Sequence, residues 1–123
     1  MKNKVLVVDD NKNNLMLEKD LLEVAGFEVF EAENGTQGIE IARKEIPDVI
    51  VLDVRLPDIR GTEVARILRQ NEVTCGIPIV FVTASVMAEG IEEIKTIPNS
   101  GFIGKPINTR TFVADVNQYI KTL

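Results

Sequence analysis

The chain has 123 residues, of which 45% are hydrophobic and 27% are charged, and its formal net charge is -5. This length suits one domain with one hydrophobic core, and the negative charge argues against direct binding to nucleic acid or to anionic lipid. The lone Cys75 excludes an internal disulfide bond, and the absence of histidine excludes Ser-His-Asp and Cys-His chemistry. The lack of a long apolar run or targeting signal predicts a cytoplasmic protein without a membrane segment.

Short apolar runs alternate along the chain with longer segments of helical period. The first run, residues 4–8, is typical of a strand that is buried on both faces. A helix is predicted over residues 14–25, with Leu15, Leu21, Leu22 and Ala25 on its inner face and a glycine at its end.

The next unit has the same order. Residues 27–32 read FEVFEA, and this alternation indicates an edge strand with one exposed face. The following segment, NGTQGIEIARKEIP, predicts a turn and then a helix with Ile39, Ala42 and Ile46 inward, which ends before Pro47.

Three further units complete the pattern. Two of their strands end in residues able to take part in chemistry, an aspartate and a threonine. The predicted elements are a buried strand at 48–53, a helix at 62–71, a buried strand at 77–83, a helix at 87–96, a strand at 101–104, and a helix at 109–123 with Phe112, Val116 and Tyr119 or Ile120 inward.

Five such units predict an α/β fold with a parallel sheet and helices on both faces, because each right-handed crossover covers the sheet. The carboxyl ends of parallel strands meet at one edge, which is where ligands bind. Four strands end there in reactive side chains: Asp9 and Asp10, Asp53, Thr83 and Lys105. The alternation leaves the strand order open. If the first and third strands are neighbours, three carboxylates share one pocket with a hydroxyl and an ammonium group.

This set of residues resembles the receiver domain of bacterial response regulators, the CheY-like family of two-component signalling. The family pattern is an acidic pair after the first strand, a phosphoacceptor aspartate after the third, Thr or Ser and a small residue after the fourth, and Lys-Pro after the fifth. Thr83 with Ala84 and Lys105 with Pro106 match the last two positions. The resemblance covers the whole chain, residues 1–123, and implies a single flavodoxin-like (βα)5 three-layer sandwich with a five-stranded sheet of order 2-1-3-4-5.

The resemblance implies that Asp53 accepts a phosphoryl group from a histidine kinase or a phosphotransfer protein in a Mg²⁺-dependent reaction. The metal ligands would be Asp10, Asp53 and the backbone carbonyl of Arg55, with Asp9 bound directly or through water. Three carboxylates in one pocket need compensating cations, and Mg²⁺ takes hard oxygen ligands. Lys105 and the hydroxyl at the end of the fourth strand would stabilise the phosphoryl oxygens. The domain would be a signalling phosphoacceptor that assists its own reactions, and not a conventional enzyme.

The family also implies a switch. Thr83 would turn towards the phosphoryl group and Phe102 would then turn inward, which would remodel a docking face for a downstream protein. The peptide bond between Lys105 and Pro106 is a candidate for the cis form. A monomer or a weak dimer that forms on phosphorylation is expected. The docking face is expected to include the helix at 87–96, the strand at 101–104 and the helix at 109–123, with apolar Val86, Met87 and Ile91 nearby.

Each residue also has an ordinary structural interpretation when taken alone. An aspartate pair is usually a turn or a helix cap, and Thr83 or a Lys-Pro pair at a strand end is common in loops. Their joint placement at one sheet edge favours the functional interpretation.

Two rival functions fit less well. A flavodoxin-like cofactor carrier would need a Gly-, Ser- and Thr-rich phosphate loop where this chain has DDNKNN. A haloacid-dehalogenase-like phosphatase resembles a D-x-D pattern, whose second acid is here Arg55. Within the family, Met1 and the end of the chain at the last predicted helix favour a free-standing regulator, and a receiver cut from a hybrid kinase or a longer regulator is the alternative.

Overall fold

The computed structural model describes residues 3–84 and 88–120, and for residues 88–91 it describes the backbone alone. Its parallel sheet has five strands in the order β2-β1-β3-β4-β5, which confirms the predicted order and fold class. None of the described helices is long and apolar enough to cross a membrane. The elements are β1 (Lys4–Val8), α1 (Lys12–Val24), β2 (Glu28–Ala32), α2 (Gly35–Glu45), β3 (Val49–Asp53), α3 (Gly61–Arg69), β4 (Ile79–Thr83), α4 (Ala88–Lys95), β5 (Ser100–Gly104) and α5 (Phe112–Asn117).

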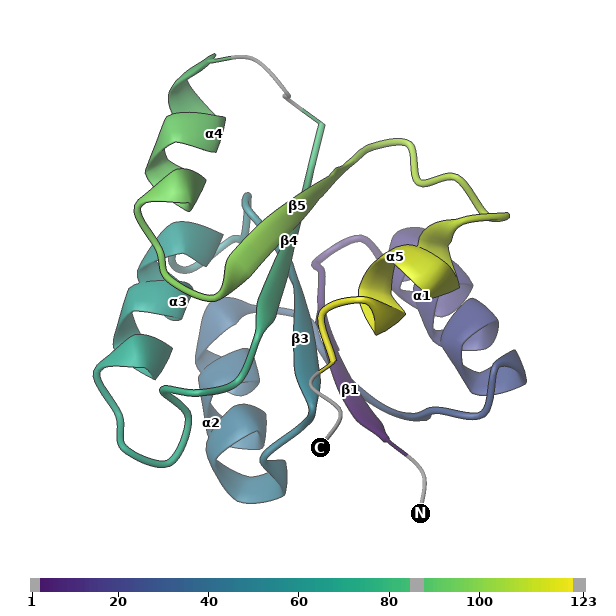
Figure 1. Cartoon of the computed structure of the whole chain (residues 1–123), viewed down its shortest axis with the longest axis horizontal. Helices are drawn as coiled ribbons and strands as arrows, with labels where there is room; N and C mark the ends of the chain where they lie inside the picture. The colour runs from purple at the N-terminus through teal and green to yellow at the C-terminus, as the bar shows by residue number, and fades with distance from the viewer. Residues whose placement is uncertain (1–2, 85–87, 121–123) are drawn as a thin grey trace.

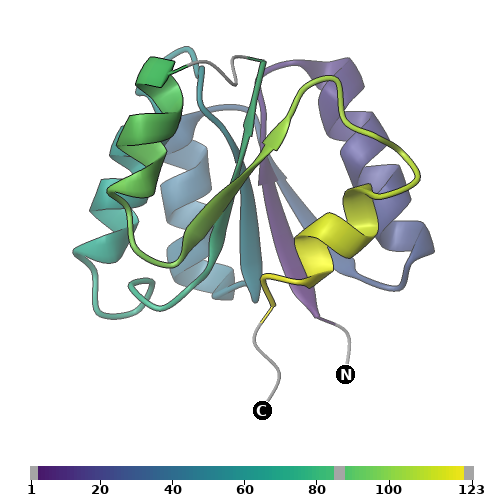
Figure 2. The same cartoon turned by 45° about the horizontal axis from the view of Figure 1, so that its top comes forward.

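The sheet is the middle of three layers (Figures 1 and 2). Helices α1 and α5 cover one face, and α2, α3 and α4 cover the other. Successive side chains of a strand point to opposite faces, so Leu6 packs beneath α2 and α3 while Val7 packs beneath α1 and α5. The strands β3 and β4 are buried along their whole length, as their unbroken apolar runs predict, whereas the edge strand β2 is partly exposed.

The helix α1 begins two residues earlier than its periodicity predicted, at Lys12. Asn11 caps it, because its side-chain oxygen accepts hydrogen bonds from the backbone N–H groups of Asn13 and Asn14. The inward assignment of Ala25 was wrong. This residue follows the last turn of the helix and is exposed.

The inward assignment of Ile46 was also wrong. Its backbone takes the left-handed conformation, with φ 47°, and 53% of the residue is exposed. A residue before proline is disfavoured from the α conformation, so the helix α2 ends one residue earlier, at Glu45, and the side chain of Ile46 leaves the apolar face. Ile39 and Ala42 are buried, as predicted.

The last helix is shorter than predicted, since α5 covers Phe112–Asn117 within a predicted 109–123. The chain after it forms tighter turns, in which the N–H groups of Tyr119 and Ile120 bond carbonyls three residues back. The inward residues Phe112, Val116 and Ile120 are buried. Residues 121–123 of the predicted helix lie outside the described residues.

Candidate functional site

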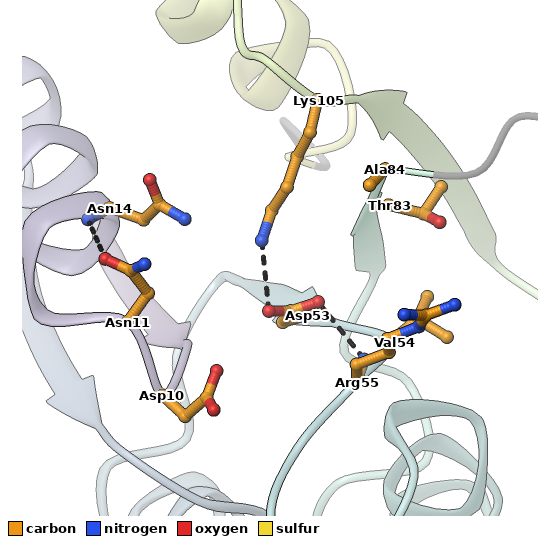
Figure 3. A pocket seen from close by; sticks show the side chains of 9 residues that line it. All are labelled: Asp10, Asn11, Asn14, Asp53, Val54, Arg55, Thr83, Ala84 and Lys105. Carbon is orange, nitrogen blue, oxygen red and sulfur yellow. Dashed lines mark hydrogen bonds and ion pairs between the residues drawn. The ribbon is translucent and has the colours of Figure 1, made fainter.

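The predicted site residues meet at the carboxyl edge of the sheet. Because β1 and β3 are neighbours, the acidic pair after β1 lies beside the aspartate that ends β3. An open pocket of about 220 Å³ lies at this edge (Figure 3). Its lining includes Asp10, Asp53, Arg55, Thr83 and Lys105, so four elements of the sheet contribute to one cavity.

Three carboxylates form a compact cluster. Asp9, Asp10 and Asp53 each offer one oxygen atom, and these oxygens lie within 4.8 Å of one another. Asp9 and Asp53 are buried, with 2% and 7% of their surface exposed, whereas Asp10 is exposed. Two backbone N–H groups orient the buried acids: that of Asn11 donates to Asp9 at 2.9 Å, and that of Arg55 donates to Asp53 at 3.1 Å.

Lys105 places its ammonium group against this cluster. Its Nζ lies 3.1 Å from Oδ2 of Asp53 and 3.5 Å from Oδ2 of Asp9. Burial lowers the pKa of Lys105, but the hydrogen bond to Asp53 and the charges of both aspartates outweigh burial, so its pKa is raised above the usual value. The lysine therefore stays charged, and among the described residues it is the one cation that forms ion pairs with the cluster.

Burial raises the pKa of Asp9 above its usual value, and the nearby charge of Asp53 acts in the same direction. The N–H of Asn11 and the charge of Lys105 oppose this rise without cancelling it. The charge of Asp9 is thus incompletely compensated by the protein itself. A further cation would stabilise the cluster.

The strand β5 positions the backbone of Lys105, which directly follows it. The backbone N–H of Lys105 donates to the carbonyl of Thr83 at 2.8 Å, so the ends of β4 and β5 are tied together beside the pocket. The peptide bond between Lys105 and Pro106 is cis. Thr83 ends β4, is 7% exposed, and lines the same pocket.

The loop after Asp53 is held closely to the strand that precedes it. The N–H of Gly61 donates to the carbonyl of Val54 at 2.8 Å, and a Cβ atom at Gly61 would overlap the carbonyl oxygen of Asp53. Asp58 caps the N-terminus of α2, because its carboxylate accepts hydrogen bonds from the backbone N–H groups of Gly35 and Thr36. Its carboxylate accepts the Thr36 hydroxyl and nearby backbone N–H groups, which hold its pKa below the usual range.

Sequence reasoning missed one titratable residue at this site, Glu18. It lies on the inward face of α1, between the buried positions Leu15 and Leu22, and is 2% exposed. Burial, followed by the charge of Asp9, raises its pKa to about 8. The spacing could have indicated this, because Glu18 follows Leu15 by three residues and precedes Leu22 by four, which places the acid on the apolar face of the helix.

The expected switch residue Phe102 lies on β5 away from this pocket, and 40% of it is exposed. It borders a second hollow, next to Ile94 and Ile97 of the α4 side and Tyr119 beyond α5. Val86, Met87 and the side chain of Ile91, which were expected near this face, lie outside the described residues.

Comparison with known proteins gives one consistent result. The family model of the response regulator receiver domain matches residues 5–117. The polar-differentiation response regulator DivK of Brucella anthropi is 33% identical over 120 residues, which cover 98% of both chains. The chemotaxis protein CheY4 of Vibrio cholerae superposes with a TM-score of 0.92 at 29% identity, covering 98% of this chain and all of that one.

A third similarity supports the fold. The receiver domain of the sensor histidine kinase PA1611 from Pseudomonas aeruginosa, solved with a magnesium ion coordinated in its active-site cleft, has a TM-score of 0.90 at 24% identity and covers 99% of this chain and 100% of its own. The chain therefore belongs to the response regulator receiver domains, which are signalling domains of two-component systems.

Proposed function

We propose that Asp53 is the phosphoacceptor of this domain. Its carboxylate attacks the phosphorus of a phosphohistidine on a histidine kinase or a phosphotransfer protein, so that a P–O bond forms as the P–N bond breaks and the imidazole leaves. The observation that carries the proposal is the cluster of Asp9, Asp10 and Asp53 within 4.8 Å, with Lys105 bonded to Asp53. The product is an acyl phosphate on Asp53.

The donor set suits Mg²⁺, which prefers hard oxygen ligands and keeps several waters. We propose Asp10, Asp53 and the backbone carbonyl of Arg55 as ligands. Asp9 would bind directly or through water, and the second mode is favoured because its oxygens already face the N–H of Asn11 and the ammonium of Lys105. Bound Mg²⁺ supplies positive charge that offsets the carboxylates and the phosphoryl oxygens.

Two further side chains complete the reaction centre in this proposal. Lys105 contacts Oδ2 of Asp53 and is suited to bind an oxygen of the phosphoryl group that arrives there. Thr83 lines the same pocket and supplies a hydroxyl for a second phosphoryl oxygen. The domain thereby assists its own phosphorylation and dephosphorylation by holding charge and geometry.

The face formed by α4, β5 and α5 is proposed to bind the downstream protein. Thr83 and Phe102 would move together on phosphorylation, with the hydroxyl turning to the phosphoryl group and the ring turning inward. The exposed ring of Phe102 beside the hollow at Ile94 and Tyr119 supports this assignment. A downstream protein would bind the remodelled face, without direct contact to nucleic acid.

The phosphodonor is proposed to approach from the side of α1. A groove of about 370 Å³ adjoins the site there, and Lys105 belongs to the lining of both. Leu17 on α1, 40% exposed, and Ile107 give the groove an apolar wall suited to a protein partner.

We further propose that residues 1–123 form one receiver domain, which is a monomer or a weak dimer after phosphorylation. The family match over residues 5–117 supports the first point. The exposed free thiol of Cys75 suits the reducing cytoplasm, which is the proposed location.

The test is incubation with acetyl phosphate in the presence and absence of Mg²⁺, followed by intact mass measurement. We expect a metal-dependent gain of one phosphoryl group in the wild type and in Asp20→Asn, an exposed control on α1, and no gain in Asp53→Asn. An adduct that forms equally without metal, or that persists in Asp53→Asn, would refute the proposal.

A further inference from the structure

Two arginines, one at the N-cap of α3 and one in its last turn, form ion pairs with one glutamate of α4. Nη2 of Arg60 lies 3.2 Å from Oε2 of Glu93, and Nη1 of Arg66 lies 3.2 Å from Oε1. Each carboxylate oxygen therefore has its own guanidinium group. Among the side chains that the structure describes, which exclude those of residues 85–91, no other ion pair joins α3 to α4. We call Arg60, Arg66 and Glu93 the α3–α4 bridge.

The two arginines differ in their position relative to α3 and to the loop after Asp53. Arg66 is inside α3 and also faces Glu63 of the same helix at 3.8 Å. Arg60 is the N-cap residue of α3, where its side chain makes no cap hydrogen bond, and it closes the loop that starts after Asp53. Of the two arginines, Arg60 is the one that directly adjoins the loop of the phosphoacceptor.

The end of this loop packs directly against its start. The residue after Arg60 is Gly61, whose N–H bonds the carbonyl of Val54 and whose Cα leaves no room for a Cβ beside the carbonyl of Asp53. A displacement of the backbone at Asp53 and Val54 is therefore passed to Gly61 and Arg60.

On α4, Arg60 contacts Glu93. Its neighbour Ile94 is 2% exposed, packs in the core beneath α4, and borders the hollow beside Phe102. A movement of Glu93 consequently changes the packing of the proposed output face. Glu93 and the switch aromatic lie on elements that touch each other, since α4 packs against β5.

We propose that the ion pair between Arg60 and Glu93 couples the state of the phosphoacceptor loop to the position of α4, and that Arg66 anchors the same glutamate without taking part in the coupling. The inference rests on the proposed function, because it assumes that phosphorylation of Asp53 displaces the loop. In the unphosphorylated protein the bridge holds α4 in its resting position. After phosphorylation, Arg60 carries the displacement of the loop to Glu93.

The test is amide hydrogen exchange of α4 and β5, followed by mass spectrometry, before and after treatment with acetyl phosphate and Mg²⁺. In Glu93→Gln the unphosphorylated α4 should exchange about two- to fivefold faster, as expected for the loss of partly exposed ion pairs. The change in α4 exchange on phosphorylation should fall by at least about half in Glu93→Gln and Arg60→Ala relative to the wild type. Arg60→Lys, which keeps the charge, should recover part of the phosphorylation-dependent change in α4 exchange.

Two controls separate coupling from simple stabilisation. Arg66→Ala removes an ion pair of the same 3.2 Å length but leaves the Arg60–Glu93 pair in place. The change in α4 exchange on phosphorylation should therefore match that of the wild type. Glu92→Gln removes the same charge from an exposed neighbour on α4 and should leave both states unchanged. A wild-type response in Arg60→Ala, or equal losses in Arg60→Ala and Arg66→Ala, would overturn the coupling role.

The same samples distinguish this failure from failure of the proposed function. Intact mass reports whether the adduct on Asp53 has formed in each variant. If the wild type forms no adduct, the proposed function is wrong. If all variants form the adduct and respond alike, the proposed function holds and the coupling through Arg60 is wrong.

Discussion

The ammonium nitrogen of Lys105 lies 3.1 Å from Oδ2 of Asp53, where it can bind a group attached to that oxygen. Methionine at this position keeps most of the side-chain length and removes the charge. Phosphorylation of Lys105→Met by acetyl phosphate should be slower by about 10²-fold, which is the usual cost of removing one donor to developing negative charge. A time course of intact mass at saturating Mg²⁺ measures this rate.

The affinity for Mg²⁺ should not fall in Lys105→Met, because the lysine competes with the metal for the same carboxylates. Isothermal titration gives this affinity independently of the reaction. Lys44→Met, which removes an exposed lysine of α2, is the matched control and should behave as the wild type. A phosphorylation rate in Lys105→Met within a factor of two of the control would contradict the assigned role.

Gly61 should not tolerate even a methyl group. Because a Cβ there would overlap the carbonyl oxygen of Asp53, Gly61→Ala must move either α3 or the end of β3. We expect a loss of about 1–3 kcal/mol in the free energy of unfolding, the usual cost of overpacking. Urea denaturation measures it. Gly76→Ala, where nothing lies within 4 Å of the added atom, is the control, and equal stability of the two variants would show that the loop is not tightly packed.

Much of the fold was predictable because its elements have strong local patterns. The buried strands β3 and β4 are unbroken apolar runs, and the acids and lysine after the strands mark one sheet edge as a site. The strand order came from family resemblance, since alternation alone does not specify it. The errors lie where a single backbone conformation decides the outcome, as at Ile46, whose left-handed backbone ends α2.

The missed features of the site are contacts between residues far apart in the sequence. Glu18 carries an ordinary helix-forming side chain, and its significance comes from burial beside Asp9. Arg60 and Glu93 are 33 positions apart, and nothing in either segment alone indicates their pairing. Local pattern reports which face of an element is apolar, but it does not report which polar side chains meet across two elements.

Glu18 should make the folded protein less stable as the pH rises. Its pKa is about 8 in the folded state and 4.5 in the unfolded chain, so the folded protein binds more protons between these values and loses stability as pH increases through that window. Between pH 5 and pH 8, this loss should be about 1–3 kcal/mol greater in the wild type than in Glu18→Gln. Urea unfolding with a chelator present measures both. Parallel pH dependence of the two proteins would contradict the raised pKa.

Arg55 should slow the hydrolysis of the acyl phosphate. Its backbone N–H is fixed by Oδ1 of Asp53, and its exposed side chain lines the pocket through which water must reach the phosphorus (Figure 3). Arg55→Ala opens this path, and dephosphorylation should be about fivefold faster, which corresponds to about 1 kcal/mol in the barrier. The decay of the adduct after removal of acetyl phosphate gives the rate. Arg55→Lys keeps a long side chain and should decay like the wild type, whereas an unchanged or slower decay in Arg55→Ala would exclude obstruction by this side chain.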